Sequence, residues 1–192
     1  GLALLAYPAY LGYQAYKLPM INDITTDPID PPRFDVLARL RPRGTVEYAG
    51  LYAAELQRKA YPDIEPLSVS AAPKAAYDAT MAIIQRRKWR VVVDRPPQPN
   101  RRDGVIEAVA RTAIMGFRDD VAIRIRPDDD GSRIDVRSAS RYGRHDFGGN
   151  ASRIRSLLED IEARADTEEK REQRQQQKQQ QPKPSPAQAG KR

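Results

Sequence analysis

The stretch that decides the fold is Arg118–Asn150, RDDVAIRIRPDDDGSRIDVRSASRYGRHDFGGN. Apolar residues alternate with polar or small ones in VAIRI (121–125) and again in IDV (134–136), which is the period-two pattern of half-buried strands. The connector PDDDG (127–131) favours a tight turn, because Asp tolerates left-handed backbone and Gly adopts it freely. The stretch therefore predicts an antiparallel hairpin that continues through a polar loop into a helix capped by Asn150.

The regions before and after this hairpin complete one α+β domain. Residues 72–89 have the apolar spacing of a helix, and residues 89–94 and 105–114 alternate like strands. Because successive strands joined by short turns pair with each other, the order predicts a four-stranded antiparallel sheet. The amphipathic helices should pack on one face of this sheet, giving a two-layer sandwich. The opposite face is expected to carry Arg124, Arg126, Asp135 and Arg137.

Composition divides the chain into four parts. Residues 1–17 are apolar up to Lys17, with a tyrosine at every third position from 7 to 16, which predicts a membrane-span remnant or, alternatively, an amphipathic helix packed on the domain. Residues 18–44 are rich in Pro and Asp and predict an extended tether lying over the domain. Residues 45–165 form the α+β domain. Residues 166–192 are mostly Gln, Lys, Arg, Glu and Pro, which predicts a disordered tail.

The charge balance suggests an anionic partner. The chain has 33 Lys and Arg against 26 Asp and Glu, a net charge of +7, and its pI is about 9.7. Anionic lipid and nucleic acid both fit such a charge. No basic run carries interleaved aromatic residues for base stacking, so nucleic acid is disfavoured.

A polar segment, residues 137–150, is the strongest candidate for a binding site. Arginine forks, serine hydroxyls and the free N–H groups of the following helix could together hold a phosphate or carboxylate. The alternative is a buried structural network in which nearby aspartates already pair with these arginines, and the near balance of Arg and Asp favours it. The candidate ligand residues are Arg137, Ser138, Ser140, Arg141, Arg144 and Asn150, and the candidates for structural ion pairing are Arg118, Asp119, Asp120, Asp135 and Asp146.

His145 and Asp146 suggest a weaker, catalytic alternative. A hydrolase would need a serine such as Ser140 within hydrogen-bond reach of His145, and no nucleophile elbow is present. Binding is therefore favoured over catalysis. With one His and no Cys, only carboxylates could hold a metal, and no calcium-loop spacing occurs, so neither a metal site nor a cofactor is predicted.

Several blocks of this sequence resemble a known family. They are IEAVARTAIMGFRDDVAIRIRP (106–127) and RIDVRSASRYGRHDFGGNASRIRSLL (133–158), with LQRKAYPDIEPL and KWRVV ahead of them. These blocks resemble the family named domain of unknown function 1499, over about residues 52–161. Members with this kind of N-terminal segment resemble bacterial envelope proteins that have a few membrane spans before the soluble domain. The resemblance therefore implies a bacterial inner-membrane protein with a periplasmic domain, and no established activity, substrate or cofactor.

The residue patterns and the family resemblance together predict a binding or structural module that is anchored to a membrane through its N-terminal segment. Its expected ligand is an anionic small molecule or a lipid headgroup. One alternative is an envelope hydrolase using His145, Asp146 and a nearby serine. Another is a scaffold subunit of a membrane complex, joined through the tyrosine-rich segment. The sequence indicates no particular protein partner.

Overall fold

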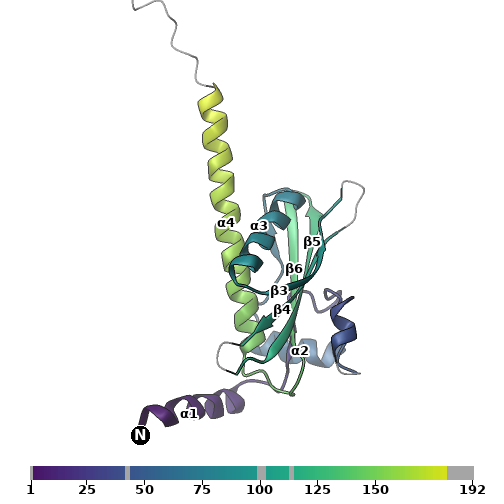
Figure 1. The fold of residues 1–192 in the computed structure, drawn as a ribbon, viewed down its shortest axis with the longest axis vertical. Helices are drawn as coiled ribbons and strands as arrows, with labels where there is room; N and C mark the ends of the chain where they lie inside the picture. Colours follow the sequence, from purple (N-terminus) through teal and green to yellow (C-terminus); the bar gives the residue numbers. More distant parts are fainter. Residues whose placement is uncertain (1, 42–43, 99–102, 113–114, 181–192) are drawn as a thin grey trace, which may run out of the picture.

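The computed structural model describes residues 2–41, 44–98, 103–112 and 115–180 (Figure 1). The elements are α1 (Leu2–Lys17), β1 (Asp23–Thr25), the 3-10 helix η1 (Leu37–Leu40), α2 (Gly50–Ala60), β2 (Leu67–Val69), α3 (Pro73–Arg86), β3 (Arg90–Arg95), β4 (Gly104–Arg111), β5 (Arg118–Asp128), β6 (Gly131–Ser140) and α4 (Gly149–Gln180).

An antiparallel sheet forms the centre of the molecule, so the predicted α+β class is confirmed. The strand order is β1-β6-β5-β4-β3, and β2 also pairs with β6. The predicted hairpin is β5–β6, closed by the pair Asp128 and Gly131. The sheet has six strands rather than the four predicted, because β1 and β2 are only three residues long and too short to show a period.

The turn of this hairpin depends on a glycine. A Cβ atom on Gly131 would collide with the backbone of Val69 and Ser70, where β2 runs alongside β6. Gly131 also has a φ of +151°, which L side chains rarely adopt. The glycine therefore lets the outer strand β2 approach the hairpin closely.

Helices α3 and α4 cover one face of the sheet and enclose the main core (Figure 1). Both helices bury an apolar stripe against the alternating apolar residues of the strands, as predicted for a helical layer on a sheet. The largest fully buried side chains here are Ile83 and Ile84 of α3, Ile154, Leu157 and Ile161 of α4, and Ile106, Ile123, Ile125 and Ile134 of the strands.

The opposite face is partly covered by the segment predicted to be a tether. Phe34 and Leu37 are buried against Val109 and Ala122 of this face. The buried carboxylate of Glu107 on β4 accepts hydrogen bonds from the N–H groups of residues 35–37, at 2.8, 3.3 and 2.8 Å. Because these N–H groups open η1, Glu107 caps this short helix and fixes the segment to the sheet.

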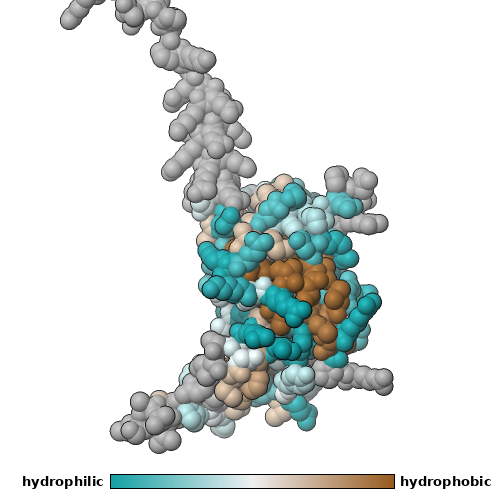
Figure 2. Space-filling view, viewed as in Figure 1, coloured by the Kyte–Doolittle hydropathy of each residue, from teal (hydrophilic) through white to brown (hydrophobic). Residues whose placement is uncertain are grey.

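Hydrophobic side chains also gather on the surface over β3 and β4, with hydrophilic ones around them (Figure 2). Residues 91–93 of β3, all valines, are half-buried there. Strand β3 pairs only with β4 and forms one edge of the sheet. Its central side chains are therefore less deeply covered than those of β4 and β5.

The two ends of the described chain are helical. No helix among the described residues has the length and apolar character needed to cross a bilayer; α1 has 16 residues with Pro8 inside it. At the other end, α4 continues through residues 166–180, where a disordered tail is predicted. Gln, Glu, Lys and Arg are good helix formers, which accounts for the extension. Residues 181–192 of the predicted tail lie outside the described residues.

Candidate anion-binding site

The start of α4, where an anion is predicted to bind, is occupied by a carboxylate of the protein itself. Asp146 Oδ1 accepts a hydrogen bond from the Gly148 N–H at 3.0 Å, and its Oδ2 accepts one from the Asn150 N–H at 2.7 Å. Asp146 is therefore the residue that caps the helix, whereas Asn150 was predicted to do so. A negative side chain already satisfies the positive end of the helix dipole.

Asn150 instead connects the helix to β6. Its side-chain oxygen accepts a hydrogen bond from Ser138 Oγ at 2.7 Å, and its side-chain nitrogen donates one to Ser140 Oγ at 3.0 Å. Both Asn150 and Ser138 are fully buried. Three of the predicted ligand residues thus bond to one another.

The two predicted arginines that precede and follow the end of β6 are buried in ion pairs. Arg137 donates to both carboxylate oxygens of Asp23, at 3.0 and 2.7 Å. Arg141 donates to Asp120 at 2.8 Å, and Arg41 donates to the same carboxylate at 3.0 Å. Burial raises the pKa of Asp23 even though Arg137 opposes that shift. These guanidinium groups are committed to structural contacts.

The residues expected to form structural ion pairs separate into two groups. Asp119 pairs with Arg153, and Asp135 accepts from Arg124, Arg126 and Arg133 at 3.1, 2.8 and 3.0 Å. Arg118 differs, because within the described ranges no carboxylate pairs with its exposed side chain. Its Cα partner across the sheet is another arginine, Arg111.

The His145 ring bonds to backbone groups of its own loop and of the segment that follows α1. His145 Nδ1 accepts a hydrogen bond from the Phe147 N–H at 2.9 Å, and Nε2 lies 3.2 Å from the Leu18 carbonyl oxygen. Nδ1 is an acceptor, so Nε2 carries the proton and donates to Leu18. Among the described residues no hydrogen bond joins His145 to Ser140, whose hydroxyl accepts one from the Asn150 side chain. Arg144 is exposed.

A second set of cations lies next to this loop, around a cavity of about 310 Å³. We call it the basic pocket. It lies at the end of the sheet where β4 finishes and β5 begins, on the face opposite α3 and α4. None of the described residues that line it is acidic. They are Leu40, Arg87, Lys88, Trp89, Arg90, Val92, Val109, Arg111, Arg118 and Arg141.

Strand register brings the basic side chains of the pocket together. Arg111 ends β4 and Arg118 begins β5, and the two are Cα partners. Arg90 begins β3 and is the partner of Val109, which lies two residues before Arg111. Like charges placed directly opposite each other on a sheet destabilise it. The antiparallel meander therefore concentrates positive charge at one end of three strands.

The cations of the basic pocket are of two kinds. Arg87 donates to Asp160 at 2.8 Å, with its guanidinium 5.5 Å from the Trp89 ring centroid, and Arg141 is bound to Asp120. The other four are exposed, and within the part of the chain that the structure describes none of them forms a hydrogen bond or ion pair through its side chain. These four are Lys88, Arg90, Arg111 and Arg118.

Lys88 occupies an unfavourable backbone conformation. It follows Arg87, the C-cap residue of α3, with a φ of 56°, in the left-handed region where glycine normally ends a helix. A left-handed conformation costs an L residue roughly 1–2 kcal/mol. The chain thus keeps a lysine at a position where glycine would be more stable.

Comparison with known protein families identifies the family of this domain. The family model described as "Protein of unknown function (DUF1499)" matches residues 23–161. The chain belongs to the DUF1499 family. The match begins at the first residue of β1 and ends within α4, so it includes every strand and the segment that covers the second face. No curated protein and no solved structure matches the chain.

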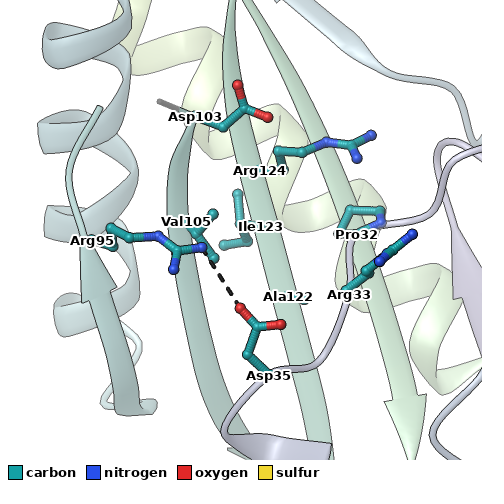
Figure 3. Close-up of a pocket in the computed structure, with 9 residues that line it drawn as sticks. All are labelled: Pro32, Arg33, Asp35, Arg95, Asp103, Val105, Ala122, Ile123 and Arg124. Carbon is teal, nitrogen blue, oxygen red and sulfur yellow. Dashed lines mark ion pairs between the residues drawn. The ribbon is translucent and has the colours of Figure 1, made fainter. Parts of the chain in front are cut away.

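The DUF1499 domain has a larger cavity, of about 480 Å³, on the same face of the sheet (Figure 3). Its lining carries charges of both signs, and Arg95 and Asp35 point toward each other, 3.7 Å apart. Arg124 of this lining is also paired, with Asp30 and Asp135. The mixed charges make this cavity a weaker candidate for an anion than the basic pocket.

Three of the four unpaired cations of the basic pocket, Lys88, Arg90 and Arg111, were not among the predicted site residues. Arg111 and Arg118 lie at equal distances from the centre of the turn between β4 and β5, but the alternation of residues 105–114 predicts a strand that continues past Arg111, so the sequence did not place this turn. In an antiparallel hairpin such residues face each other. The polar composition of residues 137–150 instead predicts a site in the neighbouring loop.

Proposed function

We propose that this DUF1499 protein is a binding module for an anionic group, a phosphate or carboxylate carried by a small molecule or lipid headgroup, and that the basic pocket is its site. The observation that carries this proposal is the group of four exposed cations without an acidic partner among the described residues. The predicted residues Arg137, Ser138, Ser140 and Asn150 then have structural roles, and Arg141 contributes part of the pocket wall.

The physical reason is that an anion would relieve a repulsion already present in the fold. Arg111 and Arg118 start from directly opposite positions, so the free protein carries their mutual repulsion. Guanidinium forks bind phosphate and carboxylate oxygens bidentately. Val92 and Val109 add apolar walls, which lower the local dielectric and strengthen such contacts. Binding would convert an unfavourable charge cluster into compensated pairs.

We further propose that the N-terminal segment attaches this module to a membrane, with the domain on the periplasmic side of a bacterial inner membrane. Tyr10, Tyr13 and Tyr16 of α1 are exposed, and the Lys17 ammonium lies 5.9 Å from the Tyr13 ring centroid. Tyrosine rings followed by a lysine are typical of a membrane–water interface. This arrangement supports attachment through α1.

The pocket contains its own reporter for a binding experiment. Trp89 lines the basic pocket and is the only tryptophan of the chain. Titration with inorganic pyrophosphate at constant ionic strength should change its fluorescence saturably. The double variant Arg111→Gln/Arg118→Gln should raise the dissociation constant at least about tenfold, which corresponds to about 1.4 kcal/mol.

A matched control tests whether the effect belongs to the pocket. Arg58 and Lys59 are exposed on α2 and do not line the pocket. The variant Arg58→Gln/Lys59→Gln removes the same formal charge and should bind pyrophosphate like the wild type. Equal weakening by the two double variants, or a titration without saturation, would show that the basic pocket is not a specific anion site.

A further inference from the structure

The tip of the β4–β5 hairpin carries exposed apolar side chains beside the basic pocket. Met115 is 63% exposed and Phe117 is 58% exposed. The Phe117 N–H donates to Thr112 Oγ1 at 2.9 Å, and the Thr112 N–H donates to the Phe117 carbonyl oxygen at 2.9 Å. Phe117 is thus held in a hydrogen-bonded turn, with its side chain in solvent, next to Arg118.

Further apolar side chains are exposed at the same end of the sheet. Tyr142 and Phe147 belong to the loop that follows β6, and they are 71% and 40% exposed. This loop is bound to the C-terminal end of α1, because His145 donates to the Leu18 carbonyl and Asn22 donates to the Gly143 carbonyl. Helix α1 therefore leaves the domain at the end where β4 finishes (Figure 1).

We propose that this end of the sheet is a membrane-docking surface for an anionic bilayer. Met115 and Phe117 enter the interfacial layer, and Lys88, Arg90, Arg111 and Arg118 bind lipid phosphates around them. This inference rests on the proposed function, since it takes the anion of the basic pocket to be a headgroup.

Charge complementarity selects a lipid surface as the occupant. Apolar side chains surrounded by cations match an anionic bilayer, which offers a hydrocarbon boundary beneath a layer of phosphates. Arg90, Arg111 and Arg118 lie on β3, β4 and β5 at the end of the sheet where the hairpin tip lies, and none of the described residues lining the pocket is acidic. Aromatic rings are favoured at the headgroup level. The exit of α1 at this end lets the anchor and the docking surface reach the same membrane.

The absence of cysteine from the sequence permits a site-specific test on the full chain. A nitroxide label on Met115→Cys reports whether the hairpin tip enters lipid, through its accessibility to oxygen and to a water-soluble nickel complex. A label on Asp129→Cys is the matched control, because this exposed turn joins β5 to β6 at the opposite end of the strands. Two kinds of vesicle are compared. One is phosphatidylcholine alone, and the other is an equimolar mixture of phosphatidylcholine and phosphatidylglycerol.

We expect the label at residue 115 to become protected from nickel on the phosphatidylglycerol vesicles, while the label at residue 129 stays in water. The variant Arg111→Gln/Arg118→Gln in the labelled background should need at least about tenfold more lipid for the same protection, since each Lys or Arg contributes to attraction by an anionic surface. Failure of the label at residue 115 to enter lipid, although the protein is vesicle-bound through α1, would overturn the inference. So would equal entry into phosphatidylcholine alone.

The two proposals fail in different ways. Saturable binding of pyrophosphate at Trp89 with no entry of residue 115 into lipid would leave the anion site standing and would assign it to a soluble ligand or an acidic protein. Lipid entry of residue 115 that is unchanged by Arg111→Gln/Arg118→Gln would show that the basic pocket takes no part in docking, and would overturn this inference.

Discussion

Arg111 and Arg118 are directly opposite Cα partners on β4 and β5, and their side chains border one pocket. A sheet selected for stability alone would place opposite charges at such a pair, because cross-strand ion pairs stabilise and like charges repel. The pair therefore marks a position where a property other than stability explains the residue types.

The first prediction follows from reversing one of these charges. Arg118→Glu should stabilise the fold by roughly 0.2–1 kcal/mol, because it replaces a like-charge pair by an ion pair. Pyrophosphate binding at Trp89 should weaken at least about tenfold at the same time. Urea unfolding measures the first effect and the fluorescence titration the second. Arg118→Gln, which removes the repulsion without adding attraction, should lie between the two proteins in stability. A less stable Arg118→Glu protein would contradict this account.

At Lys88, as at Arg118, the residue that favours anion binding is expected to lower the stability of the fold. Lys88→Gly removes an L residue from a φ of 56° and should raise the free energy of unfolding by about 0.5–1 kcal/mol, after the greater entropy of the unfolded chain is counted. It also removes a pocket ammonium, so pyrophosphate should bind more weakly. Lys88→Ala is the control, because it loses the same charge and keeps the left-handed strain. Equal stability of the Gly and Ala variants would show that the left-handed conformation costs no more than the extra unfolded-chain entropy of glycine.

The sequence predicts those parts of the fold that local periodicity encodes. Residues 121–125 and 134–136 alternate over enough positions to identify β5 and β6, and the Asp-rich connector identifies their turn. Strand β1 has three residues and is recognisable only by its pairing with residues 137–139 of β6. A pairing between segments so distant in the chain depends on tertiary context, which a single sequence does not encode locally.

In the candidate site, too, local sequence shows the residue types, whereas their roles depend on tertiary contacts. Residues 137–150 were correctly recognised as a dense polar region, but their roles depend on partners elsewhere. Arg137 is neutralised by Asp23, and Arg141 shares the carboxylate of Asp120 with Arg41. Asp23 and Arg41 both belong to the segment predicted to be a tether. The basic pocket, in contrast, is assembled by strand register. Its central pair, Arg111 and Arg118, depends on where the β4–β5 turn lies, which the alternation of residues 105–114 does not fix.

The shared carboxylate of Asp120 gives a third prediction. Asp120 is fully buried, and Arg41 and Arg141 are almost so, which means that Asp120→Asn leaves two buried guanidinium groups without a counter-charge. We expect a loss of roughly 3–5 kcal/mol in the free energy of unfolding, the range for removing one partner of a buried ion pair. Asp30→Asn is the matched control, because Asp30 is largely exposed and pairs with Arg124 and Arg126. It should cost under about 1 kcal/mol. Equal losses for the two variants, measured by urea unfolding, would show that the Asp120 cluster is not a buried anchor.

The contact between α3 and α4 predicts a dependence of stability on pH. A hydrogen bond from Arg87 lowers the pKa of Asp160, and Arg86 donates to the same carboxylate. The folded protein therefore keeps Asp160 ionised at pH values where the unfolded chain protonates it. This contribution is fully present above about pH 4, the ordinary range of Asp, and is lost as pH falls through the lower pKa of the folded state. Because Asp160 is 36% exposed, added salt should reduce this contribution to stability.

The comparison of wild type with Asp160→Asn tests the predicted direction in which stability changes with pH. The wild type should be the more stable protein near neutral pH, and the difference should shrink once the pH falls below about 4. Arg87→Gln should reduce the pH dependence in part, because Arg86 still donates to Asp160, and its effect should not add fully to that of Asp160→Asn, because Arg87 and Asp160 share one interaction. Urea unfolding at a series of pH values measures the differences, and the carboxyl carbon shift of Asp160 in NMR spectra locates its titration. A difference between wild type and Asp160→Asn that grows on acidification would reverse the sign and exclude the Arg87 hydrogen bond as its source.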